Sequence, residues 1–214
     1  MANNHYKVWF FDCDGVLLDS NSVKTEAFYE TVLKYGQDKA ESFVKYHQDH
    51  GGISRFEKFK YFFETMLGMK SFKADLARVL EEYGEIVKTK LIQCQETERL
   101  HEFLERLPPD SHKIVVSGGE QSELREVFQK RKLAEYFDSI FGSPDDKLTI
   151  LKRETDSKKN RVPAVFIGDT QYDYECARNV NVDFIFMTQY TEFKEWPQYF
   201  KEKEVKIIKN LGEL

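Results

Sequence analysis

Short runs of consecutive apolar residues recur along the chain and predict buried β-strands. The clearest runs are about five residues long and rich in Val, Ile and Phe. They are Lys7–Phe11, Lys113–Ser117, Ala164–Ile167 and Asp183–Met187, with Ser139–Gly142 as a weaker candidate. Apolar runs without polar alternation are typical of strands that are buried on both faces of a parallel sheet.

Helical spacing of apolar residues appears between these runs. Leu124, Val127 and Phe128 keep this spacing, and so do Leu148 and Leu151. Strands that alternate with helices favour an α/β fold, because parallel strands are joined by crossover connections that are usually helical. We therefore expect a Rossmann-like parallel sheet flanked by helices.

The stretch from about Ser20 to Lys90 departs from this alternation and has helical patterns only. Apolar residues recur there in two helical stripes, and a third stripe follows, which we assign to a helix that covers the sheet. The stripes are Phe56, Phe59, Phe63, Met66 and Leu67; Leu76, Val79, Leu80 and Tyr83; and Leu100, Phe103, Leu104 and Leu107. An insertion this long is not an ordinary loop. Residues 20–90 are predicted to form an all-helical cap subdomain, and residues 1–19 and 91–214 the α/β core domain.

Glycine and aromatic residues add two smaller expectations. Gly51-Gly52 interrupts the helical insertion, and Gly68 and Gly84 are expected to end helices. An aromatic group near the end of the chain predicts a terminal helix that packs on the sheet, with a dimer contact as the alternative. Its members are Tyr190, Phe193, Trp196, Tyr199 and Phe200.

Composition narrows the classes of function. The chain has 214 residues and a formal net charge of -5, which argues against nucleic acid as a partner. No apolar run approaches the roughly 20 residues of a membrane-spanning helix, and the polar Met1–Lys7 segment is not expected to be a signal peptide. Cys13, Cys94 and Cys176 contain no Cys-x-x-Cys pair, so we expect reduced cysteines in a cytoplasmic protein.

The strongest chemical signal is Asp12-Cys13-Asp14-Gly15, which follows the first apolar run directly. Ligands bind at the carboxyl ends of strands in open α/β sheets, so both carboxylates are expected at a binding site. Two buried acids need a cation nearby, and Mg²⁺ prefers carboxylate and carbonyl oxygens. Gly15 permits a tight turn and a close approach of backbone to a ligand.

Three weaker motifs follow in order along the chain. Ser117-Gly118-Gly119 ends the second run and offers a hydroxyl and backbone N–H donors that suit a phosphate. Lys147 begins a predicted helix after an acidic loop and supplies a point charge. Asp169 and Asp173 follow the fourth run, four residues apart, and can face the same metal ion. The combined order of the motifs carries the inference, because each motif taken singly is common.

The order of these motifs resembles that of the haloacid dehalogenase-like hydrolase superfamily, on its phosphatase side, which includes relatives of phosphoglycolate phosphatase and β-phosphoglucomutase. The resemblance covers almost the whole chain and implies a magnesium-dependent enzyme. It implies that Asp12 is the nucleophile and Asp14 the general acid and base. It also implies a phosphate clamp, a neutralising cation and a metal site. These are Ser117 and the backbone of Gly118 as a phosphate clamp, Lys147 as the neutralising cation, and Asp12, the Asp14 carbonyl, Asp169 and Asp173 as the metal site.

The insertion is expected to select the substrate. Arg55 follows the flexible Gly-Gly segment, and we expect its side chain to face the active site and to bind the substrate's phosphate or a polar substituent. His47 and His50 are interpreted as solvated or hydrogen-bonded residues rather than catalytic ones. Ser20 and Asn21 are a candidate hinge where the chain enters the insertion.

The resulting hypothesis is hydrolysis of a small phosphate monoester through an aspartyl phosphate. A carboxylate at Asp14 favours phosphoryl chemistry over dehalogenation, which needs no protonation of the leaving group. A sugar-phosphate phosphomutase remains an alternative, and so does a non-catalytic protein that binds a phosphorylated metabolite, although the intact acids and Lys147 argue against the latter. The sequence leaves the substrate open, and a monomer and a homodimer are both compatible with it.

Overall fold

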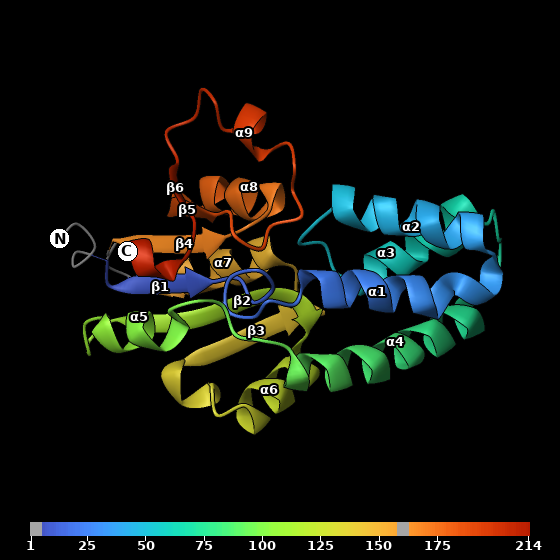
Figure 1. The fold of residues 1–214 in the computed structure, drawn as a ribbon, viewed down its shortest axis with the longest axis horizontal. Coiled ribbons are helices and arrows are strands. Elements are labelled where there is room, and N and C mark those ends of the chain that lie inside the picture. Colours follow the sequence, from blue (N-terminus) through green and yellow to red (C-terminus); the bar gives the residue numbers. More distant parts are fainter. Residues whose placement is uncertain (1–5, 158–162) are drawn as a thin grey trace.

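A parallel β-sheet lies at the centre of the computed structural model, which describes residues 6–157 and 163–214 (Figure 1). Over those residues the sheet is 6-stranded, in the order β3-β2-β1-β4-β5-β6, and every neighbouring pair is parallel. The strands are β1 (Val8–Phe11), β2 (His112–Glu120), β3 (Ser139–Ser143), β4 (Ala164–Gly168), β5 (Asp183–Met187) and β6 (Lys206–Ile208). The predicted Rossmann-like sheet is confirmed, including its weaker strand β3.

Helices cover both faces of the sheet and fill the insertion between β1 and β2. The α-helices are α1 (Asn21–Val32), α2 (Gln37–Asp49), α3 (Arg55–Tyr61), α4 (Lys73–Gln93), α5 (Leu100–Arg106), α6 (Gln121–Lys130), α7 (Lys147–Ser157), α8 (Gln171–Asn179) and α9 (Trp196–Tyr199). Single turns of other helix types are η1 (Leu33–Tyr35), the π-helical η2 (Phe62–Met66), η3 (Ala134–Tyr136) and η4 (Leu211–Glu213). Among the described residues, every helix is too short or too polar to cross a bilayer.

The central strand β1 is buried on both faces, as its apolar sequence predicts. Alternate side chains point to opposite faces, because a strand repeats every two residues. Trp9 and Phe11 join the core on one face, where Phe103 of α5 packs against both rings. Val8 and Phe10 join the core on the other face. The third apolar stripe therefore covers the sheet, as expected.

The helical insertion lies beyond the carboxyl ends of the strands (Figure 1). The chain enters and leaves it along two adjacent segments. The Asp19 N–H donates to the Gln95 carbonyl at 2.9 Å, and the Thr97 N–H donates to the Leu17 carbonyl at 3.1 Å. The insertion therefore connects to the sheet through two paired segments, directly beside the end of β1.

Helix packing inside the insertion follows the predicted stripes, with one exception. Phe59, Phe63, Val79 and Tyr83 are buried, whereas Phe56 is exposed. The aromatic residues near the end of the chain also behave as expected, since Phe186 of β5 contacts Phe193, Trp196 and Phe200. The terminal helix itself is short, because α9 spans only Trp196–Tyr199.

Glycine positions give one wrong prediction. Gly51-Gly52 separates α2 from α3, and Gly68 has a positive φ just after η2, both as expected. Gly84, however, lies inside the continuous helix α4 instead of ending it. A Cβ there would lie 2.6 Å from Glu123 Oε1 and 3.4 Å from Arg55 Nη1. Gly84 therefore leaves room for the ion pair between Arg55 of α3 and Glu123 of α6.

Gly84→Ala tests this explanation. Replacing a glycine in a helix interior normally stabilises a protein by about 1 kcal/mol. We expect this gain to be missing in the wild-type background, because the Arg55–Glu123 pair must shift. In a Glu123→Ala background the same substitution should recover about 1 kcal/mol. Urea unfolding of the four proteins measures both effects, and an equal gain in the two backgrounds would contradict the close approach.

Candidate active site

Two acidic residues follow neighbouring strands at the point where the strand order reverses. Asp12 comes directly after β1 and Asp169 directly after β4. Connections from these two strands diverge to opposite sides of the sheet, which leaves a crevice between their carboxyl ends. Oxygens of Asp12, Asp169 and Asp173 all lie within 4.8 Å of one another, and all three residues are buried. The fold thus gathers carboxylates from distant parts of the chain.

Gly15 makes the tight turn that brings β1 to this cluster. Its φ is +75°, and a Cβ at this position would overlap the Asp169 carboxylate and crowd the Asn21 side-chain amide. Residues with a Cβ are disfavoured at this φ. Both the backbone conformation and the available space therefore require glycine at position 15.

Lys147 lies among the carboxylates at the start of α7. Its Nζ is 2.8 Å from Asp12 Oδ1 and 2.7 Å from Asp173 Oδ1, and all three side chains are buried. Burial opposes the charge of the lysine, but attraction to the two acids raises the pKa of Lys147 overall. Burial also raises the pKa of Asp12 to about 7, with repulsion from Asp173 and Asp14 adding to the shift and Lys147 opposing it.

The remaining negative charge suits a divalent cation. Asp169 Oδ1 is buried and has no hydrogen-bond partner among the described residues, while Asn21 donates to Asp169 Oδ2 at 2.7 Å. Burial and the neighbouring Asp12 and Asp173 raise the pKa of Asp169 well above its usual range. Three carboxylates share one lysine here, so the oxygen-rich site fits Mg²⁺ in charge and donor type.

Both carboxylate oxygens of Asp173 accept hydrogen bonds from other residues. Its Oδ1 accepts from Lys147, and its Oδ2 accepts from the Thr170 hydroxyl at 2.6 Å and from the Thr170 N–H at 3.2 Å. Thr170 and Asp173 form the capping box of α8. Asp173 thus belongs to the cluster and also fixes the start of its own helix.

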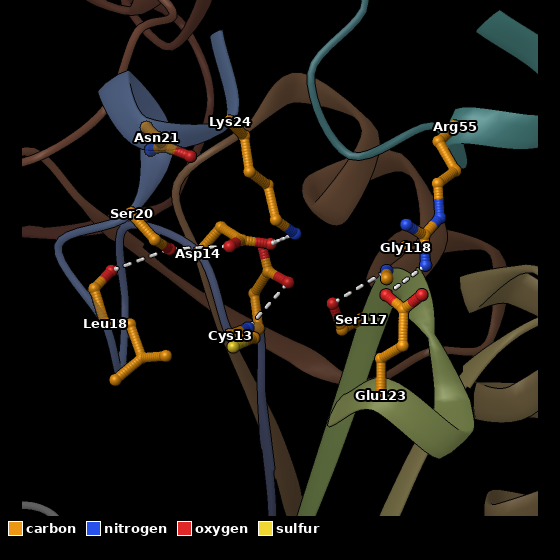
Figure 2. A network of polar contacts seen from close by, with 12 residues as sticks. Cys13, Asp14, Leu18, Ser20, Asn21, Lys24, Arg55, Ser117, Gly118 and Glu123 are labelled. Atoms are coloured by element: carbon orange, nitrogen blue, oxygen red, sulfur yellow. Dashed lines mark hydrogen bonds and ion pairs between the residues drawn. The ribbon is translucent and has the colours of Figure 1, made fainter. Parts of the chain in front are cut away.

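Asp14 is held by residues at the start of the insertion (Figure 2). The Ser20 hydroxyl donates to Asp14 Oδ1 at 2.6 Å, and Lys24 of α1 pairs with Asp14 Oδ2. Burial would raise the pKa of Asp14, but attraction to Lys24 and the two hydrogen bonds lower it overall. Sequence reasoning missed Lys24, although Asn21 and Lys24 lie three residues apart on the helix that follows the Asp-x-Asp-Gly motif.

Ser117 and Gly118 both lie near the end of β2, but at different depths. Ser117 is fully buried and does not line the cavity, and its hydroxyl accepts from the Gly119 N–H at 3.0 Å. Gly118 does line the cavity. A Cβ on Gly118 would lie 2.7 Å from the Gly52 carbonyl, so the insertion's glycine loop closes directly over this strand end.

The cavity between the sheet and the insertion has a volume of about 300 Å³. Asp12, Asp14, Lys147 and Asp169 line it from the side of the sheet. The insertion contributes a second wall, which includes Phe28, His47, Arg55, Lys58 and Tyr83. The volume is at the small end of the usual range for ligand pockets, so the cavity suits a small metabolite.

Arg55 lines this cavity, and its guanidinium is already paired. It donates to Glu123 of α6 (Figure 2) and lies over the Tyr83 ring with 5.2 Å from Cζ to the ring centroid. Glu123 was not predictable from the sequence, because its contact with Arg55 joins residues far apart in the chain. His47 is buried and bonded to Lys58, whereas His50 is exposed and contacts the Tyr46 carbonyl.

The cysteines show no feature of a catalytic thiol. Cys13 and Cys176 are buried, and Cys94 is partly buried. Burial raises the pKa of all three thiols above the usual range, which disfavours the reactive thiolate.

Comparison with known proteins agrees with the fold and the motif order. Residues 9–187 match the family model described as haloacid dehalogenase-like hydrolase. A relative named pyrophosphatase PpaX, from Caldanaerobacter subterraneus subsp. tengcongensis, is 28% identical over 95% of this chain and 94% of its own length. The chain belongs to the haloacid dehalogenase-like hydrolases and is an enzyme of this family.

Solved structures are similar over almost their whole length. A protein from Haemophilus somnus described as a phosphoglycolate phosphatase has a TM-score of 0.77 at 14% identity, over 99% of this chain and 97% of its own. The β-phosphoglucomutase of Clostridium difficile has a TM-score of 0.75 at 16% identity, over 98% of this chain and 93% of its own. At these identities the likeness concerns the fold alone.

Proposed function

We propose that this enzyme hydrolyses a small phosphate ester or anhydride with Mg²⁺, through an aspartyl phosphate on Asp12. The observation that carries the proposal is the contact of Asp12 with Lys147, beside Asp169, on the wall of a small cavity. An anionic nucleophile must approach a phosphoryl dianion, so the site needs fixed positive charge where the two meet. Lys147 supplies part of that charge. Asp12, Asp169 and the Asp14 carbonyl, with Asp173 nearby, would hold Mg²⁺, which would supply more of that positive charge.

Each residue has a defined task in this mechanism. A carboxylate oxygen of Asp12 attacks phosphorus, and the bond from phosphorus to the leaving oxygen breaks. Asp14 gives its proton to that oxygen and then takes a proton from the water that attacks the aspartyl phosphate. The second step releases inorganic phosphate and restores the Asp12 carboxylate. Backbone N–H groups near Gly118 orient the phosphoryl oxygens, and Ser117 supports that segment from beneath.

The protonation of Asp14 depends on its neighbours in the insertion. Lys24 and Ser20 favour the carboxylate form in the free enzyme. An incoming phosphoryl dianion opposes that effect, because a nearby negative charge favours the protonated acid. We propose that substrate entry thus prepares Asp14 to donate its proton, and that residues 20–90 act as a cap that encloses the reaction. Ser20 and Asn21 stay the candidate hinge of this cap.

The proposed substrate is a small phosphorylated metabolite. The relative named as a pyrophosphatase and the similar structure named as a phosphoglycolate phosphatase make pyrophosphate and phosphoglycolate the first compounds to test. The similar β-phosphoglucomutase keeps a phosphomutase as the second candidate. A mutase would return the phosphoryl group to a sugar and release an isomer in place of free phosphate. We expect the enzyme to work in the cytoplasm, as a monomer or a homodimer.

Release of inorganic phosphate from a panel of phosphorylated metabolites tests the proposal. Wild-type protein in Mg²⁺ should release phosphate from at least one small member of the panel, and excess EDTA should abolish the release. Added Mg²⁺ should restore it, because the three-carboxylate cluster needs a hard cation. Formation of a sugar-phosphate isomer without free phosphate would favour the mutase. Release that is unaffected by EDTA would contradict the role of the metal.

A further inference from the structure

Lys58 is a buried cation without an acidic partner. It lies on α3, lines the cavity and is 2% exposed. Its Nζ contacts His47 Nδ1 at 2.6 Å and the His47 carbonyl at 3.3 Å, and no carboxylate of the described chain lies within ion-pair distance. The other lysines and the arginine of this cavity differ, since each is paired. They are Lys24 with Asp14, Arg55 with Glu123, and Lys147 with Asp12.

Two neighbouring donors also lack partners. An ammonium can only donate, so His47 Nδ1 accepts from Lys58 and the ring hydrogen of a neutral His47 lies on Nε2. His47 is 9% exposed, and its Nε2 has no hydrogen-bond partner among the described residues. Arg55 is 6% exposed, and its Nη1 likewise has none. Buried donors are normally paired, so these two, beside an ammonium that has no acidic partner, indicate a missing acceptor.

An aromatic surface connects these donors. The Phe28 ring lies 4.4 Å from the His47 ring and 4.3 Å from the Tyr83 ring, measured between centroids. Lys58 Nζ lies 5.5 Å from the Phe28 centroid, and Arg55 Cζ lies 5.2 Å from that of Tyr83. Arg55 and Lys58 are three residues apart on α3, which places them on the same side of the helix. The donors therefore share one apolar wall.

The acidic groups around Lys58 do not compensate its positive charge. Burial lowers the pKa of Lys58 to about 7, with repulsion from Lys24 and Lys147 adding to the effect and Asp14 and Glu192 opposing it. Glu192 is engaged elsewhere, since it accepts from the Thr25 hydroxyl at 2.9 Å and from the Gln48 amide at 3.3 Å. A buried cation without a partner is costly, and a bound anion removes that cost.

We propose that Lys58, His47 and Arg55 form an anion subsite in the insertion, and that the substrate carries a second acidic group besides the phosphoryl group attacked by Asp12. This inference rests on the proposed function and names its substrate class. The second group is a carboxylate or another phosphoryl group, because both accept hydrogen bonds and carry the charge that Lys58 lacks. A neutral hydroxyl would leave the ammonium uncompensated. The cavity volume of about 300 Å³ keeps the two acidic groups of one small molecule close together.

Matched substrates test the subsite. The panel pairs 2-phosphoglycolate with 2-hydroxyethyl phosphate, and pyrophosphate with methyl phosphate, so that each pair differs in the second acidic group. Wild-type kcat/KM should favour the acidic member of at least one pair. Lys58→Met should reduce that preference by about 10- to 100-fold, since it removes a charged hydrogen bond. A reduced preference in the phosphoglycolate pair would identify the second group as a carboxylate, and one in the pyrophosphate pair as a phosphoryl group. Lys60→Met is the matched control, because Lys60 is an exposed lysine on the same helix.

A binding measurement separates this inference from the proposed function. Phosphonoacetate carries two acidic groups and methylphosphonate only one, and neither has an ester bond to hydrolyse. Phosphonoacetate should raise the unfolding temperature of the wild type more than methylphosphonate does, and Lys58→Met should remove the difference. That result in a protein that releases no phosphate would support the subsite and reject hydrolysis. Hydrolysis with equal preference in wild type and folded Lys58→Met would overturn the subsite and keep the hydrolase.

Discussion

Asp12→Asn is expected to lower turnover on the order of a thousand-fold or more while the protein stays folded. The amide has the shape of the carboxylate but cannot form the proposed aspartyl phosphate. Burial and the neighbouring acids raise the pKa of Asp12 to about 7, so the charge at this position is costly to the folded state. The variant should therefore be at least as stable as wild type when EDTA is present. Steady-state kinetics and thermal unfolding measure the two effects.

The control for this prediction is Asp156→Asn, which changes an exposed carboxylate on α7 and should leave both properties unchanged. Trapping adds a direct test of the intermediate. Wild-type protein that is quenched during turnover of a substrate labelled in its phosphoryl group should retain the label, and Asp12→Asn should not. A folded Asp12→Asn protein with near-normal turnover would remove Asp12 from the role of nucleophile.

Lys147→Met is expected to impair both activity and folding. Lys147 contacts Asp12 at 2.8 Å and Asp173 at 2.7 Å, and the three side chains are buried. Removing one partner of a buried ion pair typically costs about 3–5 kcal/mol, because the remaining charge loses its compensation. The loss of positive charge at the phosphoryl group should also reduce kcat by about a hundred-fold or more. Urea unfolding measures the change in the free energy of unfolding, and steady-state kinetics measure the change in kcat.

Lys152→Met is the comparison for Lys147→Met, since Lys152 is exposed on the same helix. Mg²⁺ should stabilise Lys147→Met more than it stabilises wild type, because the added cation compensates acids that have lost their lysine. A normal free energy of unfolding combined with a large loss of kcat would show that Lys147 acts only in catalysis. Unchanged kcat would exclude the proposed role.

The central features of the fold were predictable because they depend on local sequence. β1 and β4 are buried on both faces, so each appears as an uninterrupted apolar run. Parallel strands end at a common edge, so acids that directly follow two such runs can meet, as the family resemblance implied for Asp12 and Asp169. The convergence of Asp12 and Asp169 agrees with that reasoning. Strand β6 was missed because it has only three residues, of which only Ile208 is buried.

Contacts between distant segments were not predictable from a single sequence. Gly84 was predicted to end a helix because glycine is a common helix terminator, yet its role depends on Glu123, which lies on another helix. Lys58 gave no sign that it would be buried without an acid, because lysines on a helix are usually solvated. Ser117 was expected to bind the phosphate. It lies beneath Gly118 and does not line the cavity, because β2 continues past it to Glu120.

The two paired segments beside the end of β1 have a consequence for how this protein can change. Leu18 and Glu96 form an antiparallel bridge, so a replacement for the intervening residues needs only ends that lie about 5 Å apart. Such an exchange leaves the β1–β2 register unchanged, since Val8 pairs with His112 in the sheet itself. The helices of the insertion can therefore be exchanged as one unit. If the insertion acts as the proposed cap, another set of helices would change the accepted molecule, provided that it keeps Ser20, Asn21 and Lys24, which hold Asp14 and Asp169.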